Sequence, residues 1–199
     1  MKLKASFYTR KNVVQISKEL LGMKLTTFFN NQLTAGIITE TEAYVGITDK
    51  ASHSFGNRRT NRTEVMYAKG GTAYVYICYG IHHLFNVVTN DKDVPDAVLI
   101  RAIHPIVGIE TMQRRRNKNV MNKAFANGPG TAVVALGIDI THNGLSLLED
   151  RIWIENKGIA IPEKDIIIGP RVGVESAGAD GLLPYRFRIL NKELFKNIK

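Results

Sequence analysis

Cysteine is almost missing from the sequence, and so are the long apolar segments of secreted and membrane proteins. The chain has 199 residues and one cysteine, Cys78, which excludes a disulfide scaffold and a cysteine-rich zinc site. Residues 1–15 hold no apolar run of signal-peptide length, and no segment reaches the ~18 apolar residues of a membrane helix. We therefore expect a cytoplasmic protein, with Cys78 as a small buried apolar residue rather than a nucleophile.

Motifs for phosphate loops and metal clusters are also lacking. No Walker loop and no dinucleotide-binding glycine motif occurs. His82 and His83 are adjacent, so on a strand they point to opposite faces and cannot chelate together. His53 has no neighbouring ligand at metal-binding spacing. We expect no metal and no cofactor.

Acidic residues are outnumbered by basic ones. The sequence has 27 Lys and Arg against 18 Asp and Glu, a formal net charge of +9. Such an excess favours a polyanionic partner, either nucleic acid or an anionic membrane surface. With 44% hydrophobic residues, no internal repeat and no linker, the chain is expected to form one domain over residues 1–199.

Hydrophobic spacing and turn residues predict an α+β arrangement. In the first half we expect an irregular start over 1–8, a helix from Thr9 to Gly22, strands over 23–29 and 33–44, and a long loop over 45–63. In the second half we expect a hairpin over 72–89, a strand over 97–102, and a helix opened by Pro105 that runs through Ile109 and Met112. We also expect a helix entered at 127–130 and strand-like segments from 145 to 190, including 152–154 and 166–168.

The hairpin over 72–89 is rich in tyrosine. Its two strands are expected to turn at Tyr79-Gly80. Strand side chains alternate between faces, so Tyr74 and Tyr76 share one face, while Tyr79 has the opposite parity and lies at the tip. One face of the hairpin is therefore expected to form a pocket wall, and the tip to meet a partner.

Two charged residues stand on strands that are otherwise apolar, Glu42 and Arg101. Ionising a buried carboxylate costs free energy unless a partner stabilises it. Two interpretations stay open: a buried ion pair between sheet neighbours, or a carboxylate kept ionised to activate a water molecule. Glu40 lies two residues from Glu42, so both could face the same side, a weak indication of glycosidic-bond chemistry.

Several segments, in the same order along the chain, resemble the alkyladenine (3-methyladenine) DNA glycosylase family. They are Glu40–Tyr44, Ala51–Ser54, Gly71–Gly80, Val98–Ala102, Asn127–Gly130 and Arg171–Val174. The resemblance covers about residues 10–190. It implies a single compact α+β domain with a curved, mostly antiparallel sheet, flanking helices and a protruding hairpin that inserts into DNA.

The resemblance also implies a role for each matched residue. Glu42 would be the general base for an attacking water, and Arg101 with the backbone near Val172 would hold that water. Tyr79 would fill the gap left by a flipped nucleotide. The implied pocket for the flipped purine is lined by Tyr44, His53, Tyr76 and Asn86, of which Asn86 would exclude the guanine amino group.

The implied activity is hydrolysis of the N-glycosidic bond of alkylated or deaminated purines in damaged double-stranded DNA. Such an enzyme leaves an abasic site, and because no matched pocket position is a lysine, no Schiff-base lyase is implied. A monomer without membrane contacts is expected. Basic residues that could contact phosphates, or could be solvated surface charges, are Arg58, Arg59, Arg62, Lys69 and Arg114–Arg116. A non-catalytic damaged-DNA-binding module and an RNA-binding protein remain alternatives.

Overall fold

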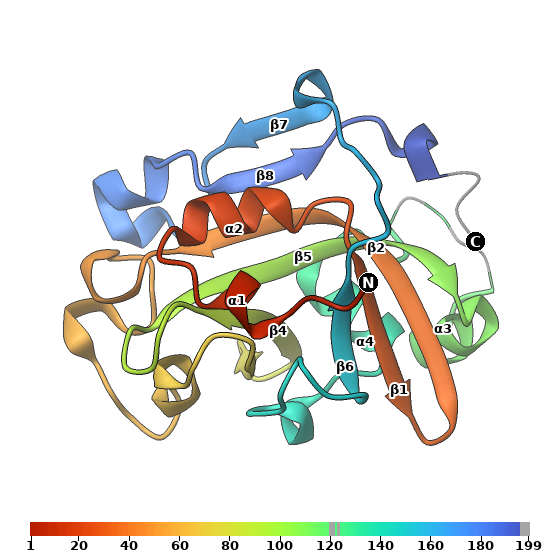
Figure 1. Ribbon diagram of the computed structural model, residues 1–199, viewed down its shortest axis with the longest axis horizontal. Coiled ribbons are helices and arrows are strands. Elements are labelled where there is room, and N and C mark those ends of the chain that lie inside the picture. The colour runs from red at the N-terminus through yellow and green to blue at the C-terminus, as the bar shows by residue number, and fades with distance from the viewer. Residues whose placement is uncertain (120–121, 123, 196–199) are drawn as a thin grey trace.

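The longest strand, β2 (Gln32–Tyr44), lies at the centre of an antiparallel sheet (Figure 1). The structure is a computed structural model that describes residues 1–119, 122 and 124–195. One edge of β2 pairs with β5 (Asp96–Val107). The other edge is shared, because β1 (Lys24–Phe29) pairs with the first half of β2 and β8 (Arg186–Ile189) pairs with Glu40–Glu42. Strands on both sides therefore fix the backbone around Glu42.

The remaining strands extend this sheet. They are β3 (Ala73–Cys78), β4 (His82–Thr89), β6 (Ile152–Glu155) and β7 (Ile166–Gly169). The strand order is β3-β4-β5-β2-β1-β6, and β7 joins through β8. β3 and β4 form the predicted hairpin, in which Tyr79 and Gly80 have φ angles of 50° and 74°. Positive φ at both positions suits a tight hairpin turn, and it confirms the predicted place of the turn.

Within the described residues, the α-helices are α1 (Ala5–Tyr8), α2 (Val13–Glu19), α3 (Ile109–Arg116) and α4 (Pro129–Leu136). Figure 1 shows α2 lying across β2 and β5, and α3 packs against α4. β2 is buried without interruption from Thr34 to Ala43. Since strand side chains alternate, continuous burial means that both faces of β2 are covered. The two carboxylates of this strand therefore lie in the interior.

The long connection between β2 and β3 contains no strand among its described residues, as predicted. Short 3-10 segments shape it and four other parts of the chain: Gly46–Thr48, Phe55–Asn57, Glu64–Tyr67, Ile140–His142, Glu163–Asp165, Glu175–Leu182 and Lys192–Phe195. The prediction of strand-like segments in the C-terminal part is confirmed at β6, β7 and β8. It is wrong over Glu175–Leu182, where Gly178 and Gly181 interrupt the apolar pattern of a strand.

The predicted helix through Ile109 and Met112 is confirmed as α3, but its predicted start at Pro105 is wrong. β5 continues through Pro105 to Val107, and α3 begins only at Ile109, after Gly108 with φ of 70°. Proline lacks the N–H that a central strand donates, so it is tolerated where one edge is unpaired. β4 pairs only with Asp96–Leu99, which leaves Pro105 hydrogen-bonded to β2 alone. The other helix entry is confirmed: Pro129 is the first residue of α4, and Gly137 with φ of 71° ends it.

The N-terminal boundaries also differ from the prediction. Residues 1–8 are not all irregular, because Ala5–Tyr8 forms a helical turn, and α2 starts at Val13 rather than near Thr9. The capping residue is Asn12, whose side chain accepts the N–H of Gln15. Asparagine caps helices at least as well as threonine does, which accounts for the start of α2 after Asn12.

The described residues form one compact α+β domain around a curled antiparallel sheet, which confirms the predicted fold class. The expected domain over 1–199 also includes residues 120, 121, 123 and 196–199, which lie outside the description. None of the described helices has the length and hydropathy to cross a membrane. That the hairpin protrudes into DNA stays a prediction.

Candidate active site

A bulge in β5 directs Arg101 toward the carboxylates of β2. Ala102 pairs with Glu40, and Ile100 pairs with Thr41, so Arg101 is an extra residue between two pairs. Bulges of this kind re-aim side chains and are common beside active sites. Nε of Arg101 lies 2.9 Å from Oε1 of Glu40. The bulge therefore points the guanidinium of Arg101 at the carboxylates of β2.

Three groups hold the fully buried carboxylate of Glu42. Nη1 of Arg101 lies 3.2 Å from Oε1, and the backbone N–H of Val172 donates to the same oxygen at 2.9 Å. The hydroxyl of Tyr44 donates to Oε2, also at 2.9 Å. Burial raises the pKa of the Glu42 carboxyl above its ordinary value, and the Arg101 charge with the two hydrogen bonds opposes that rise. The predicted ion pair exists, and a raised pKa also suits a general base.

Glu40 also holds the guanidinium of Arg101, at a different nitrogen from Glu42. Its Oε1 accepts from Nε of Arg101 and, at 2.7 Å, from Nε of Arg186 on β8. Glu40 and Glu42 both contact Arg101, so they face the same side of β2, as predicted. The site thus holds two carboxylates and two guanidiniums, and Glu42 is the member with no exposed surface.

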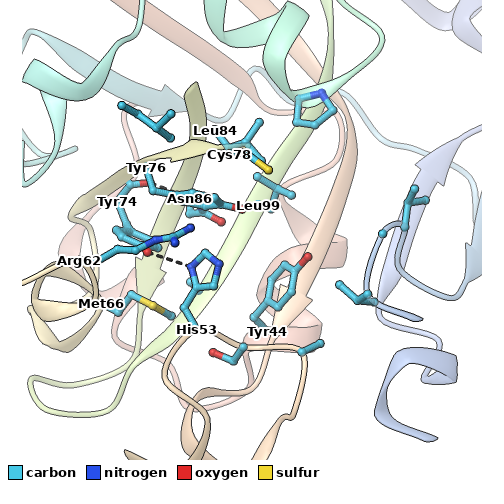
Figure 2. A pocket seen from close by; sticks show the side chains of 18 of the residues that line it. Tyr44, His53, Arg62, Met66, Tyr74, Tyr76, Cys78, Leu84, Asn86 and Leu99 are labelled. Atoms are coloured by element: carbon cyan, nitrogen blue, oxygen red, sulfur yellow. Dashed lines mark hydrogen bonds between the residues drawn. The ribbon is translucent and has the colours of Figure 1, made fainter. Parts of the chain in front are cut away.

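A pocket of about 630 Å³, shown in Figure 2, borders this ion-pair cluster through Arg101, which lines it. All three residues that hold Glu42 line it, whereas Glu42 itself lies behind them. The remaining predicted pocket residues, His53, Tyr76 and Asn86, line it too. The structure therefore brings the sequence-predicted residues together around one cavity, although they come from β2, β3, β4, β5 and two loops.

One wall of the pocket is aromatic. The rings of Tyr74 and Tyr76 stack with centroids 5.4 Å apart, and His53 meets Tyr76 edge-on at 4.6 Å. Figure 2 shows Tyr44 on the other side of the cavity from this wall. Nδ1 of His53 hydrogen-bonds the Tyr74 hydroxyl at 3.0 Å. Asn86 is buried at the base of the wall, where its Nδ2 donates to the Tyr74 carbonyl at 3.2 Å. That bond fixes the orientation of the amide.

The electrostatics of the wall keep His53 neutral. Burial, with the nearby charges of Arg62 and Arg58, lowers its pKa from 6.5 to about 4. The guanidinium of Arg62 lies over the ring of Tyr76, 5.1 Å from its centroid. Burial raises the pKa of Tyr74 to about 12 and that of Tyr76 higher still. The pocket therefore offers neutral aromatic groups near neutral pH.

Tyr79 stands at the edge of the same pocket, on the hairpin tip. Its side chain is almost free of protein contacts, with 89% of the residue exposed. Its φ of 50° lies in the left-handed region, which is unfavourable for a tyrosine. Ile81 beside it is 74% exposed. A strained, solvent-exposed aromatic residue does not stabilise the fold, so a role in binding a partner is expected for Tyr79.

The basic residues fall into two groups. Arg59 is bound within the protein, by ion pairs to Glu64 and Asp93 and by stacking on Tyr67. Arg115 and Arg116 also donate to groups of their own chain. Exposed Arg58 and Lys69 remain candidates for phosphate contacts. Arg62 lines the pocket, whereas the sequence predicts it only as a possible phosphate contact.

Several residues of the site were not predicted from the sequence. Cys78 lines the pocket and is half-buried, so the expectation of a buried apolar residue is wrong. Lys50 also lines the pocket, although no lysine was expected there. The buried pair of Asp49 and Arg171, and the contact of Arg186 with Glu40, depend on pairings between distant segments. Asp49 is flanked by Thr48 and Lys50, so no local signal pointed to its burial or to its pairing with Arg171.

A buried carboxylate behind an aromatic pocket, with an exposed tyrosine at its rim, defines a candidate hydrolytic site for a flat, planar substrate. Comparison with known proteins agrees with this class. Residues 6–193 match the model of the family described as methylpurine-DNA glycosylase (MPG). The chain belongs to the methylpurine-DNA glycosylase family, and it is a DNA glycosylase, a hydrolase of base excision repair.

Relatives match the chain over nearly its whole length. A protein of Chlamydia felis named "Putative 3-methyladenine DNA glycosylase" is 44% identical over 197 residues, covering 98% of this chain and 100% of the relative. A protein of Clostridium perfringens with the same name is 42% identical, covering 95% of this chain and 96% of the relative. A third with that name, from Bacillus mycoides, is 43% identical over 199 residues.

Proposed function

We propose that this enzyme flips alkylated purines, foremost 3-methyladenine, out of duplex DNA and hydrolyses their N-glycosidic bond with a water activated by Glu42. The observation that carries the proposal is the placement of Glu42. It is fully buried, yet Tyr44, Arg101 and Val172, which contact its carboxylate, all line the pocket. A base on the carboxylate side of the pocket would have its glycosidic bond near Glu42.

The contacts of Glu42 leave one lone-pair direction of its carboxylate for a nucleophilic water. An ionised carboxylate has about four lone-pair directions. Among the described residues, the Val172 N–H and Arg101 approach Oε1, while the Tyr44 hydroxyl alone approaches Oε2. The remaining direction on Oε2 can accept the proton of a water. The ionised carboxylate also stabilises the positive charge that develops on the sugar as the bond breaks.

The aromatic wall would favour alkylated purines. Methylation at a ring nitrogen makes the base cationic, and a cation is attracted to the faces of Tyr76 and Tyr44, over which the guanidiniums of Arg62 and Arg171 already lie. His53 is neutral and does not repel it. Asn86, held by the Tyr74 carbonyl, would exclude the amino group of guanine. The same pocket would admit hypoxanthine and ethenoadenine, which lack that group.

Tyr79 would occupy the space left in the duplex by the flipped nucleotide. Stacking on an aromatic side chain is worth about 1–3 kcal/mol per base, which offsets part of the cost of flipping. A second cavity of about 420 Å³ adjoins the first and is bordered by Lys50, Arg58 and Arg62. These cations would neutralise phosphates near the flipped nucleotide. We propose that the enzyme acts on double-stranded DNA as a monomer.

The proposal is tested with duplexes that carry one damaged base each. The panel contains 3-methyladenine, 7-methylguanine, hypoxanthine and ethenoadenine, with an undamaged adenine duplex as the control. Release of 3-methyladenine with an intact abasic product is expected, and undamaged adenine stays in place. Binding to the damaged duplexes without release of any base would instead identify a non-catalytic damage sensor.

A further inference from the structure

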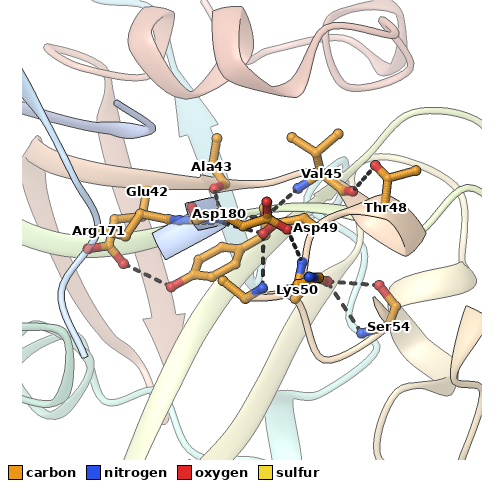
Figure 3. Close-up of polar contacts among 12 residues, drawn as sticks. Glu42, Ala43, Val45, Thr48, Asp49, Lys50, Ser54, Arg171 and Asp180 are labelled. Atoms are coloured by element: carbon orange, nitrogen blue, oxygen red, sulfur yellow. Dashed lines mark hydrogen bonds and ion pairs between the residues drawn. The ribbon is translucent and has the colours of Figure 1, made fainter. Parts of the chain in front are cut away.

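A buried ion pair joins the two loops that carry opposite parts of the pocket. Nη1 and Nη2 of Arg171 donate to the two carboxylate oxygens of Asp49, and Nη2 lies 2.9 Å from Oδ1 (Figure 3). The side chains are 0% and 2% exposed. Asp49 belongs to the loop after β2, and Arg171 follows β7. A two-pronged pair of this kind fixes orientation as well as distance.

The same two side chains collect backbone groups from three segments. The carboxylate of Asp49 accepts the N–H groups of Val45 and Ala51 at 3.1 and 3.0 Å. Arg171 donates to the carbonyls of Ala43 and Asp180, each at 2.9 Å. The pair therefore ties together the end of β2, the loop that leads to the aromatic wall, and the segment after β7.

This arrangement bears directly on Glu42. Ala43, whose carbonyl Arg171 holds, is the next residue after Glu42 on β2. Val172 is the next residue after Arg171, and its N–H donates to Oε1 of Glu42. Val172 lies outside regular secondary structure, is 46% exposed, and precedes Gly173 with φ of 74°. Its own side chain does not anchor it, so the Arg171 side chain fixes where its N–H points.

We propose that the Asp49–Arg171 pair is a positioning element that holds the Val172 N–H on Glu42 and keeps the two loop walls of the pocket in register. The inference rests on the proposed role of Glu42 as general base. Neither Asp49 nor Arg171 lines the pocket. Both act through Val172 and the ends of the loops, and Arg171 also acts through Tyr44, because its guanidinium lies 4.8 Å from the centre of that ring. Neither touches the reacting atoms.

The proposal has a signature in the pH profile. The Val172 N–H lowers the pKa of Glu42, so its loss would raise that pKa and move the acid limb of the rate to higher pH. Glu42 is also faced by the charged or titratable groups of Glu40, Tyr44, Tyr76, Arg101 and Arg171, with Arg186 beside it on β8. Asp96 needs a control, because its pKa of about 6 is raised by burial and then by Asp49.

The test compares Asp49→Asn with wild type in single-turnover excision from a methylated duplex between pH 5 and 9. The expected result is a rate roughly 10-fold lower at pH 6, with recovery toward the wild-type rate above pH 8, as for loss of a hydrogen bond to a charged group. Arg171→Lys, which keeps the charge but not the fork, is expected to shift the acid limb in the same direction. Asp96→Asn, alone and combined with Asp49→Asn, removes the second titration.

Glu155→Gln serves as the matched control, because Lys24–Glu155 is a partly buried pair between β1 and β6, away from the pocket. An equal loss at every pH in Asp49→Asn, or no loss, overturns the proposal. If both pair variants fail to fold while Glu155→Gln folds, the pair is a general folding element, and the proposal is also overturned. A wild-type acid limb that persists in Glu42→Gln would instead refute the proposed function itself.

Discussion

The Tyr44 hydroxyl donates a 2.9 Å hydrogen bond to Oε2 of Glu42, two residues earlier on the same strand. Residues two apart on a strand share a face, so β2 places the carboxylate and its donor without help from a loop. Burial, then the charge of Glu42, raises the pKa of Tyr44, which keeps the hydroxyl protonated and donating. The bond lowers the pKa of Glu42.

Tyr44→Phe is therefore expected to shift the acid limb of the excision rate to higher pH. Losing a hydrogen bond to a charged group is worth about 1.5–3 kcal/mol, so the rate at pH 6 should fall roughly 10- to 100-fold. At higher pH, where a larger fraction of Glu42 is ionised in both proteins, the deficit should be smaller. Single-turnover rates across this range check the prediction, and a pH-independent deficit would show that Tyr44 acts only by shaping the pocket.

Glu42→Gln is expected to stabilise the fold at high pH. A carboxyl with a raised pKa binds its proton more tightly in the folded state than in the unfolded state. The free energy of unfolding therefore falls as pH rises from the ordinary pKa of a glutamate toward the raised pKa of folded Glu42. Glutamine removes this dependence. Thermal unfolding of both proteins at pH 5 and pH 8 should show the variant gaining relative to wild type at pH 8. A gain that does not grow with pH would argue against a destabilised carboxylate.

His53 predicts a stability change in the opposite direction. Its folded pKa of about 4 lies below its ordinary value of 6.5. Between these two pH values the folded state binds fewer protons than the unfolded state does, so the free energy of unfolding falls as pH falls. Wild type should lose at most roughly 3 kcal/mol of stability from this residue across that range. Urea unfolding at pH 7.5, 6 and 5 should show a steeper loss in wild type than in His53→Gln. Substitution of the exposed His82 by glutamine is the control, and equal slopes in wild type and His53→Gln would contradict the account.

Tyr79→Ala is expected to separate flipping from chemistry. Because this side chain is 89% exposed, the melting temperature should not fall. Loss of aromatic stacking of about 1–3 kcal/mol should slow excision from duplex DNA roughly 5- to 100-fold. Excision of the same base from single-stranded DNA should change little. A similar loss on both substrates would place Tyr79 in the pocket rather than in the duplex.

The local parts of the site were readable from the sequence. Strand alternation alone put Tyr74 and Tyr76 on one face and Tyr79 at the tip, and the stacked rings confirm the first pair. The resemblance to a glycosylase family supplied roles that alternation could not. Glu42 and Arg101 already stood out as charges on apolar strands, and the resemblance gave each a role, but nothing in the local sequence showed that a bulge aims Arg101 at both carboxylates.

Contacts between distant segments were beyond sequence reasoning. Asp49 and Arg171 are 122 positions apart, and their pairing depends on how β7 and β8 dock beside the end of β2. The helix start predicted at Pro105 is wrong for a related reason. A proline suggests a helix start locally, and only the absence of β4 beyond Leu99 makes it acceptable inside β5.

The most direct test of the account is the single-turnover excision rate of Glu42→Gln on a methylated duplex, measured beside DNA binding. Removing a general base and the charge that stabilises the sugar cation should lower the rate at least ~1,000-fold, with duplex binding within a few-fold of wild type. Glu155→Gln, the control variant, should keep the wild-type rate. Excision by Glu42→Gln at the wild-type rate, with unchanged binding, would contradict the account.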